Sequence, residues 1–143
     1  MKKLLTAVLL LLVLCILCSC GIPKKEAPKN DIFTDEFFEG VNQITLLVMA
    51  EPVTGEQMEP VIAHLKSLTL TPTETRLTNI GENGEVLNGG PLHLVLEYDS
   101  GEQKTALVST GIITFYEGGS YKVEDEYFYR GLLEAFGKTW EAE

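Results

Sequence analysis

All three cysteines of this sequence, Cys15, Cys18 and Cys20, lie within its first 20 residues. The thiol of cysteine is a nucleophile that can be modified covalently. The region opens with two lysines after Met1, continues with an almost unbroken apolar run from 4 to 17, and closes with small residues just ahead of Cys20. This order is typical of a secretion signal followed by a processing site. The sequence therefore predicts that the chain is exported and cleaved directly before Cys20.

The four residues Leu17-Cys18-Ser19-Cys20 resemble the lipobox of bacterial lipoproteins. In that family the final cysteine is diacylated on sulfur and becomes the first residue of the mature protein. The resemblance implies that residues 1–19 are a cleaved signal peptide and that Cys20 is the lipid attachment site, anchored in the cell membrane on its extracytoplasmic face. An uncleaved transmembrane anchor and a plain secreted product are the alternatives. A spanning helix needs about 20 apolar residues, whereas a run of about 10 to 14 fits a signal peptide better.

Cleavage at this point would leave a single, lipidated cysteine in the mature chain. We therefore expect a domain without disulfides, without a thiol nucleophile and without a thiolate metal site. Such an exported domain must be held together by its hydrophobic core alone. The 113 residues from 31 to 143 suffice for one compact domain with a real core and are too few for two.

Charge divides the mature chain into a tether and a domain. Residues 20–30 contain the predicted lipidated cysteine and a tether with three lysines, one glutamate and two prolines, a net charge of +2. Residues 31–143 contain six basic and 20 acidic residues, a net charge of −14. We expect the tether to lie near anionic headgroups and the domain to be repelled by them. The same acidity argues against binding to nucleic acid, because phosphate contacts need clustered Lys and Arg.

The residues that could support catalysis or metal binding do not form a recognisable motif. His64 falls at the edge of an apolar helical stripe and His93 alternates with leucines, so both are predicted to be packed or boundary residues. The serines and threonines do not stand in Gly-x-Ser-x-Gly or Ser-x-x-Lys patterns. The segment 79–90 resembles a calcium-binding loop but has Gly90 where a bidentate glutamate is needed. We predict no catalytic residue, no metal and no cofactor.

Apolar periodicity and turn residues predict the elements of the domain. A short helical turn is expected at 31–40, capped by Thr34 and with Phe33 and Phe38 placed as a hydrophobic staple. Helices are predicted over 54–66, with an uncertain start because of Pro60 and an apolar stripe of Met58, Val61, Leu65 and Leu68, and over 125–136, with an acidic start and an end at Gly137. Strands are predicted over 43–50, 68–78, 92–97, 105–109, 112–116 and 121–123, with a loop at 80–91. Leu47 and Met49 lie on the second face of the first strand, so this strand is expected to be covered on both sides. These elements predict a single α+β domain with an antiparallel sheet of about five to six strands and two main helices, preceded by a signal peptide and a short tether.

Tyrosines gather toward the end of the chain. Tyr116 and Tyr121 lie in the last predicted hairpin, and Tyr127 and Tyr129 lie in the last predicted helix. Tyrosine is common at protein interfaces. We therefore predict an interaction surface that includes Tyr121, Tyr127 and Tyr129, with ordinary packing between helix and sheet as the alternative.

The order of these features is similar to that of small lipoproteins of uncharacterised function from Gram-positive bacteria. The similarity rests on the lipobox, the basic tether, Ile44-Thr45, the segment Leu65 to Leu68, and Gly118 to Val123 before an acidic helix. It implies a membrane-anchored extracytoplasmic lipoprotein and supplies no catalytic residue. The predicted function is a non-enzymatic interaction or accessory module with an unknown protein partner. The alternative is a small-ligand-binding or hydrolytic domain with a site near the loop 80–91, which a deep pocket lined by a histidine and carboxylates would favour.

Overall fold

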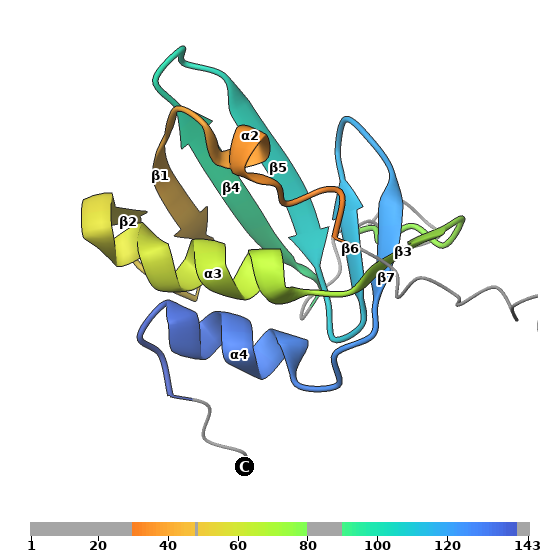
Figure 1. The fold of residues 1–143 in the computed structure, drawn as a ribbon. Helices are drawn as coiled ribbons and strands as arrows, with labels where there is room; N and C mark the ends of the chain where they lie inside the picture. Colours follow the sequence, from red (N-terminus) through yellow and green to blue (C-terminus); the bar gives the residue numbers. More distant parts are fainter. Residues whose placement is uncertain (1–29, 48, 80–89, 140–143) are drawn as a thin grey trace, which may run out of the picture.

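The computed structural model describes residues 30–47, 49–79 and 90–139 (Figure 1). The predicted signal peptide, Cys20, nearly all of the tether and most of the loop 80–91 lie outside the described residues. The predictions made for those segments therefore stay predictions.

The described residues form one α+β domain built on an antiparallel sheet, which confirms the predicted fold class. The sheet has seven strands in the order β2-β1-β4-β5-β6-β7-β3. The strands are β1 Val41–Leu46, β2 Val53–Thr54, β3 Leu70–Thr73, β4 Leu92–Tyr98, β5 Gln103–Val108, β6 Ile112–Phe115 and β7 Ser120–Val123. Around it lie α2 Asp35–Phe38, a 3₁₀ turn Gly55–Met58, α3 Glu59–Ser67 and α4 Phe128–Ala135. Six of the seven strands correspond to predicted ones, and β2, with two residues, is the addition.

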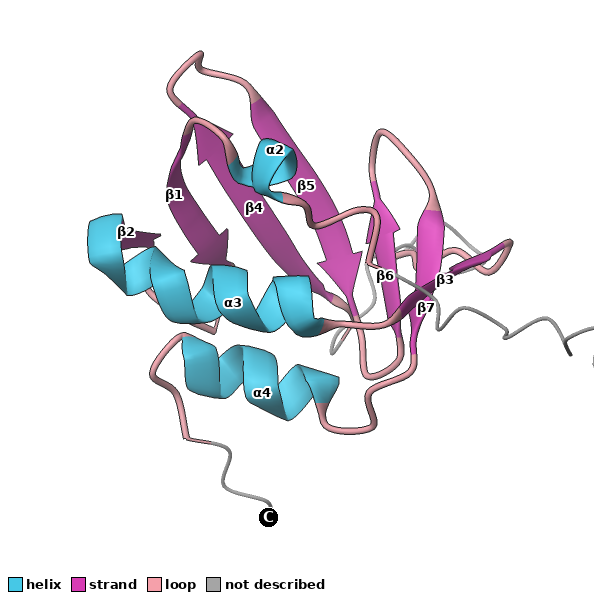
Figure 2. Ribbon diagram, in the orientation of Figure 1, coloured by secondary structure: helices cyan, strands magenta, loops and turns pink. Residues whose placement is uncertain are grey.

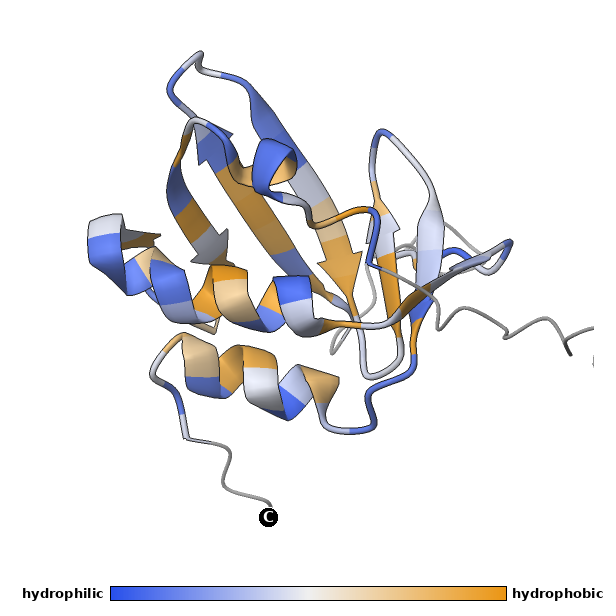
Figure 3. Cartoon of the chain, viewed as in Figure 1, coloured by the Kyte–Doolittle hydropathy of each residue, from blue (hydrophilic) through white to orange (hydrophobic). Residues whose placement is uncertain are grey.

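The helices lie on one face of the sheet, where α3 and α4 run side by side (Figure 2). The strand register sets this face: Leu94 and Leu96 of β4 pair with Leu46 and Ile44 of β1 and, on the other side, with Ala106 and Lys104 of β5. Because side chains alternate along a strand, these residues point to the same side. The apolar residues concentrate in β4, in the second half of β5 and in parts of β1, α3 and α4 (Figure 3). The largest fully buried side chains are Phe33, Phe128, Ile44, Leu46, Leu65, Leu94, Leu96, Ile113, Leu132, Leu133, Val61 and Val108.

The first helical turn follows its prediction closely. The Thr34 hydroxyl caps α2 by accepting a hydrogen bond from the Phe37 N–H at 3.2 Å. The rings of Phe33 and Phe38 stack with their centroids 6.0 Å apart, which is the predicted hydrophobic staple. The turn is thereby fixed on the helix-covered face of the sheet, above β4 and β5 (Figure 1).

The chain enters the domain at Asn30, which is held against the end of α3. Its side-chain amide donates hydrogen bonds to the carbonyls of Leu65 at 2.7 Å and Lys66 at 3.2 Å. Its side-chain oxygen accepts from the N–H groups of Phe33 at 2.9 Å and Ile32 at 3.3 Å. The last turn of a helix leaves carbonyls without intrahelical partners, and Asn30 satisfies two of them.

Pro60 lies in the first turn of helix α3. The helix begins at Glu59, so the proline occupies its first turn, and the chain before it forms a separate 3₁₀ turn. The proline therefore costs no interior hydrogen bond. The predicted stripe of Met58, Val61, Leu65 and Leu68 is buried throughout, as expected.

Helix α4 begins three residues later than predicted, at Phe128. The acidic residues expected in its first turn instead precede it, where an Asp125 side-chain oxygen accepts a hydrogen bond from the Tyr127 N–H at 2.8 Å. The end of the helix is as predicted. Gly137 has a φ of +72°, and the N–H groups of Gly137 and Lys138 bond to the carbonyls of Glu134 and Leu133, which is a Schellman motif.

The prediction that the first strand extends to Ala50 and is covered on both faces is only partly right. Strand β1 lies inside the sheet, between β2 and β4, but it ends at Leu46. Leu47 and Met49 follow it and are 43% and 38% exposed. The second face is therefore covered at Thr45, which is 8% exposed, and not at the two residues on which the prediction relied.

Candidate functional site

A cleft of about 330 Å³ opens between the first half of β5 and the β6–β7 hairpin. Its volume is near the lower end of the range of small-ligand sites, about 300 to 1,000 Å³. We call it the aromatic cleft, and its lining residues are Ile32, Phe37, Glu102, Gln103, Lys104, Thr105, Phe115, Tyr116, Glu117, Gly118, Gly119 and Tyr121. It does not include the described end of the loop 80–91, near which the alternative site was predicted.

The cleft exists because β6 pairs with the second half of β5 and diverges from its first residues. Strand β6 pairs with β5 only from Ala106 to Val108, after which the Tyr116 N–H still bonds to the Thr105 carbonyl at 3.0 Å. Beyond that point the hairpin diverges from β5 (Figure 1). Gln103 and Lys104 therefore lie beside an opening instead of a neighbouring strand.

Arg76 holds the far wall of the cleft in place. Its guanidinium group donates to the carbonyl of Gly118 at 2.8 Å and to that of Phe115 at 2.9 Å. These carbonyls belong to the turn of the β6–β7 hairpin, and an arginine fork can fix two acceptors at once. The Tyr121 side chain lies over the same turn. A Cβ atom at Gly119 would be 3.0 Å from the Tyr121 hydroxyl, so the ring occupies the space beside that glycine.

Aromatic rings form the floor and one side of the cleft. Phe115 lies between Phe37 and Tyr121, with ring centroids 6.0 and 6.2 Å away and edge-to-face angles of 70° and 79°. Phe33, which is buried beneath them, contacts Phe37 and Phe115 at 5.3 and 5.9 Å. Each such contact contributes about 0.5–1.5 kcal/mol to stability beyond the burial of the rings. The rings are therefore held in fixed positions on this side of the cleft.

The charged residues of the cleft leave an excess of negative charge. The Lys104 ammonium group lies 4.9 Å from the Phe37 ring centroid and 4.7 Å from that of Tyr98, and 3.9 Å from a Glu102 oxygen. The single cation is thus already engaged with two rings and one carboxylate. Glu117, on the opposite wall, makes no ion pair with any residue that the structure describes.

The three tyrosines predicted to share one surface differ in their surroundings. Tyr121 lines the aromatic cleft, whereas neither Tyr127 nor Tyr129 does. Tyr127 is 66% exposed just before α4, and Tyr129 packs against the core, where burial raises the pKa of its hydroxyl. Tyr116, which is 52% exposed, is the second tyrosine of the cleft.

Sequence reasoning did not single out Phe37, Lys104 or Glu117 as site residues. One local signal was available for the hairpin. The glycine pair 118–119 stands between Tyr116 and Tyr121, a pattern that places two tyrosines at the two ends of one turn. No comparable signal joins this hairpin to Phe37 or Lys104, which are distant in the sequence.

Both histidines are packed, as predicted. The His93 Nδ1 is 3.2 Å from the Tyr116 hydroxyl, and the two rings meet edge to face. The His64 ring stacks on Phe128 with an interplanar angle of 4°, and its Nε2 is 3.0 Å from the Phe128 carbonyl oxygen. Each ring therefore has a structural partner, and neither lines the aromatic cleft.

His64 also explains the glycine in the middle of α4. A Cβ atom at Gly131 would lie 2.5 Å from the His64 Cε1, so the imidazole occupies the space that a side chain there would need. We expect Gly131→Ala to lower the free energy of unfolding by about 1–3 kcal/mol through overpacking. The gain of about 0.5–1 kcal/mol in helix propensity offsets this only in part.

The clash can be tested by a double-mutant cycle with His64→Ala. In that background the obstructing ring is gone, so Gly131→Ala should become neutral or stabilising. Urea denaturation of the wild type, both single variants and the double variant would measure the coupling. An equal loss of stability in both backgrounds would show that the ring does not cause the requirement for glycine.

Among residues 30–47, 49–79 and 90–139 there is no group of three or more His, Cys, Asp or Glu side chains that could hold a metal ion. Within the same ranges, no helix has the length and apolar character required to cross a membrane.

Comparison with known proteins adds no further assignment. No protein-family model, curated protein or solved structure matches this chain. The arguments about function therefore rest on its own residues.

Proposed function

We propose that this chain is a lipoprotein anchored through Cys20 at the extracytoplasmic face of the cell membrane, where its domain acts as a non-enzymatic binding module. The aromatic cleft is the surface through which it engages its partner. The observation that carries the proposal is the exposure of aromatic and acidic side chains around an opening in the sheet.

The composition of the cleft supports binding more than catalysis. Tyr116 and Tyr121 present large, rigid side chains with polar ends, and such residues dominate the energetics of many protein interfaces. Acid–base catalysis would need a titrating group with a perturbed pKa directed into the site. Tyr129, whose hydroxyl pKa is raised by burial, lies outside the cleft.

Binding of a small ligand is the second candidate function. Its site would be the aromatic cleft and not the neighbourhood of the loop 80–91, where it was first predicted. The cleft volume of about 330 Å³ favours it, and so do Glu102 and Glu117 on opposite walls. A histidine does not line the cleft, although His93 contacts Tyr116 from behind.

The proposal predicts that a partner can be crosslinked from one tyrosine position and not from another. A photoreactive phenylalanine analogue would replace Tyr116 in the cleft or Tyr127 outside it, and intact membranes would be irradiated. Both positions are more than half exposed, so they are matched in accessibility. We expect a discrete protein adduct from position 116 and none from position 127.

The reverse pattern, or equal adducts from both positions, would contradict the assignment of the cleft as the binding surface. Far-UV circular dichroism of the two substituted chains provides the control for folding. An adduct with a small metabolite in place of a protein would support the second candidate.

A further inference from the structure

One residue at the start of β5, Gln103, has backbone groups at the aromatic cleft that are unpaired within the described part of the chain. In β5, the Glu102 carbonyl accepts from Tyr98 of β4, whereas the Thr105 carbonyl accepts from Tyr116 on the β6 side. Backbone groups alternate in direction along a strand, so the N–H and C=O of Gln103 also point toward the β6 side. Pairing with β6 begins only at Ala106, so among the described residues Gln103 has no strand partner there.

The two outer edges of the sheet are protected, in contrast to this opening. One edge strand, β2, has only two residues. The other, β3, contains Pro72. The Thr69 carbonyl accepts from the Glu124 N–H just after β7, and backbone groups alternate in direction, so those of Thr71 and Thr73 also point toward β7 and the Pro72 nitrogen points outward. Proline removes an outward donor, and short or proline-containing edges are typical defences against unwanted strand pairing. The backbone beside β5 lacks such a defence.

The side chains around the opening match an extended basic segment. Successive side chains of an added strand would point to opposite faces, so alternate ones would reach the rings of Phe37, Phe115 and Tyr121. Glu102 and Glu117 flank the opening from the two walls, and Glu117 has no cationic partner among the described residues. The domain carries a net charge of −14 over residues 31–143, which favours approach of a positively charged segment.

We propose that the aromatic cleft receives a short, extended, lysine- or arginine-containing segment of a partner polypeptide, which pairs with the backbone N–H and C=O of Gln103 at the start of β5. This inference deepens the proposed function, on which it rests, by naming the class of partner and its mode of binding. Main-chain hydrogen bonds to β5 would set the register, the rings would bind alternate side chains, and Glu117 would pair with the basic residue.

The test uses the mature chain from residue 20 with Cys20→Ala, so that no lipid is required. A random heptapeptide library with blocked ends is captured on the immobilised protein, and the retained peptides are sequenced by mass spectrometry. We expect enrichment of peptides that carry Lys or Arg together with apolar residues at alternating positions. Failure to enrich any peptide class would overturn the inference.

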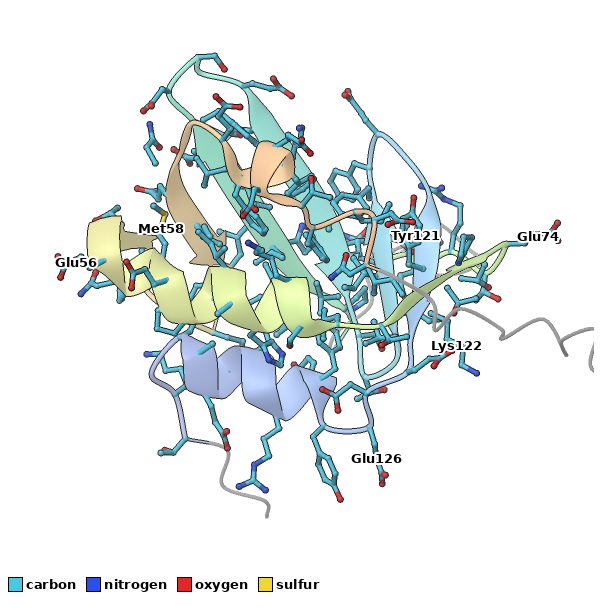
Figure 4. All side chains as sticks on the ribbon, in the orientation of Figure 1. Glu56, Met58, Glu74, Tyr121, Lys122 and Glu126 are labelled. Atoms are coloured by element: carbon cyan, nitrogen blue, oxygen red, sulfur yellow. The ribbon has the colours of Figure 1, made fainter. Side chains whose placement is uncertain are left out.

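Two charge-reversal variants give a matched comparison. Glu117→Lys lies in the cleft wall, whereas Glu126→Lys lies near α4, well away from Tyr121 of the cleft (Figure 4), and both residues are exposed. Both change the net charge equally, so they separate local pairing from general electrostatic attraction. We expect Glu117→Lys to weaken binding of the enriched peptides about tenfold or more and Glu126→Lys to weaken it far less. Equal weakening by both variants would overturn the proposed local contact.

Backbone methylation distinguishes strand addition from capture of a cation. N-methylation at alternate amides of an enriched peptide should abolish binding in one register and leave it largely intact in the other. Retention of full affinity by both methylated peptides, or equal binding of N-acetyl-lysine amide alone, would overturn strand addition and assign the cleft to a small organic cation.

One further variant tests whether the basic tether of the chain itself occupies the cleft. With Lys24, Lys25 and Lys29 all changed to Gln, the affinity for the enriched peptides should not change. A clear rise in affinity would mean that the tether occupies the cleft in cis, which would overturn the inference of a partner in trans. A crosslink from position 116 without peptide enrichment would leave the proposed function standing and reject only the extended segment.

Discussion

Cys20→Ala is expected to abolish incorporation of labelled palmitate and to release the protein from the membrane fraction. Two long acyl chains on one sulfur-linked glycerol provide stable anchoring, since each buried CH₂ contributes about 0.8 kcal/mol. The three tether lysines could contribute only about 1 kcal/mol each near an anionic surface. The acidic domain, with its net charge of −14, opposes that attraction.

The measurement is metabolic labelling followed by separation of membrane and soluble fractions. Cys18→Ala serves as the matched control, because it also removes a thiol from the same region and leaves the final cysteine of the motif intact. Its labelling should be close to that of the wild type. Continued labelling and membrane retention of Cys20→Ala would refute the lipoprotein assignment.

The largest loss of folding stability is expected from Phe128→Ala. Phe128 is fully buried in the core, its ring stacks on His64, and its backbone carbonyl lies within hydrogen-bond distance of the same imidazole. Removing a buried phenylalanine side chain costs about 3–5 kcal/mol. Because a small domain has a total stability of about 5–15 kcal/mol, this single change should bring the protein close to unfolding at ordinary temperatures.

Thermal denaturation followed by circular dichroism would measure this effect as a fall in Tm of roughly 10–20 °C. Tyr127→Ala is the adjacent control, since this aromatic residue is 66% exposed and its loss should change the unfolding free energy by less than about 0.5 kcal/mol. Similar Tm values for both variants would show that α4 is not packed on α3 as described.

Local patterns predicted those elements whose stability is decided within a few residues of sequence. The hairpin of β4 and β5 follows from alternating leucines around Asp99-Ser100-Gly101, and the staple of Phe33 and Phe38 follows from their spacing about Thr34. The end of α4 follows from Gly137, which alone can readily adopt the positive φ observed there. In each case the residues that form the contact are neighbours in the chain.

Features that depend on distant partners could not be predicted in this way. Strand β2 has two residues and exists because Val53 and Thr54 pair with β1, which no periodicity in so short a segment reveals. The aromatic cleft arises where β5 and β6 diverge. Arg76, which bonds to the hairpin turn there, precedes its partners Phe115 and Gly118 by 39 and 42 residues. The predicted tyrosine surface did not include this opening, because the spacing of tyrosines in the sequence does not reveal where two strands diverge.

The fastening of Asn30 to the end of α3 has a mechanical consequence. Ile32, only two residues further along, already lines the aromatic cleft. Tension applied between the proposed anchor and a molecule held in the cleft would thus pass through a short path at one side of the domain. Little of the applied force would then act on the sheet and the hydrophobic core, so the domain could stay folded while it is pulled.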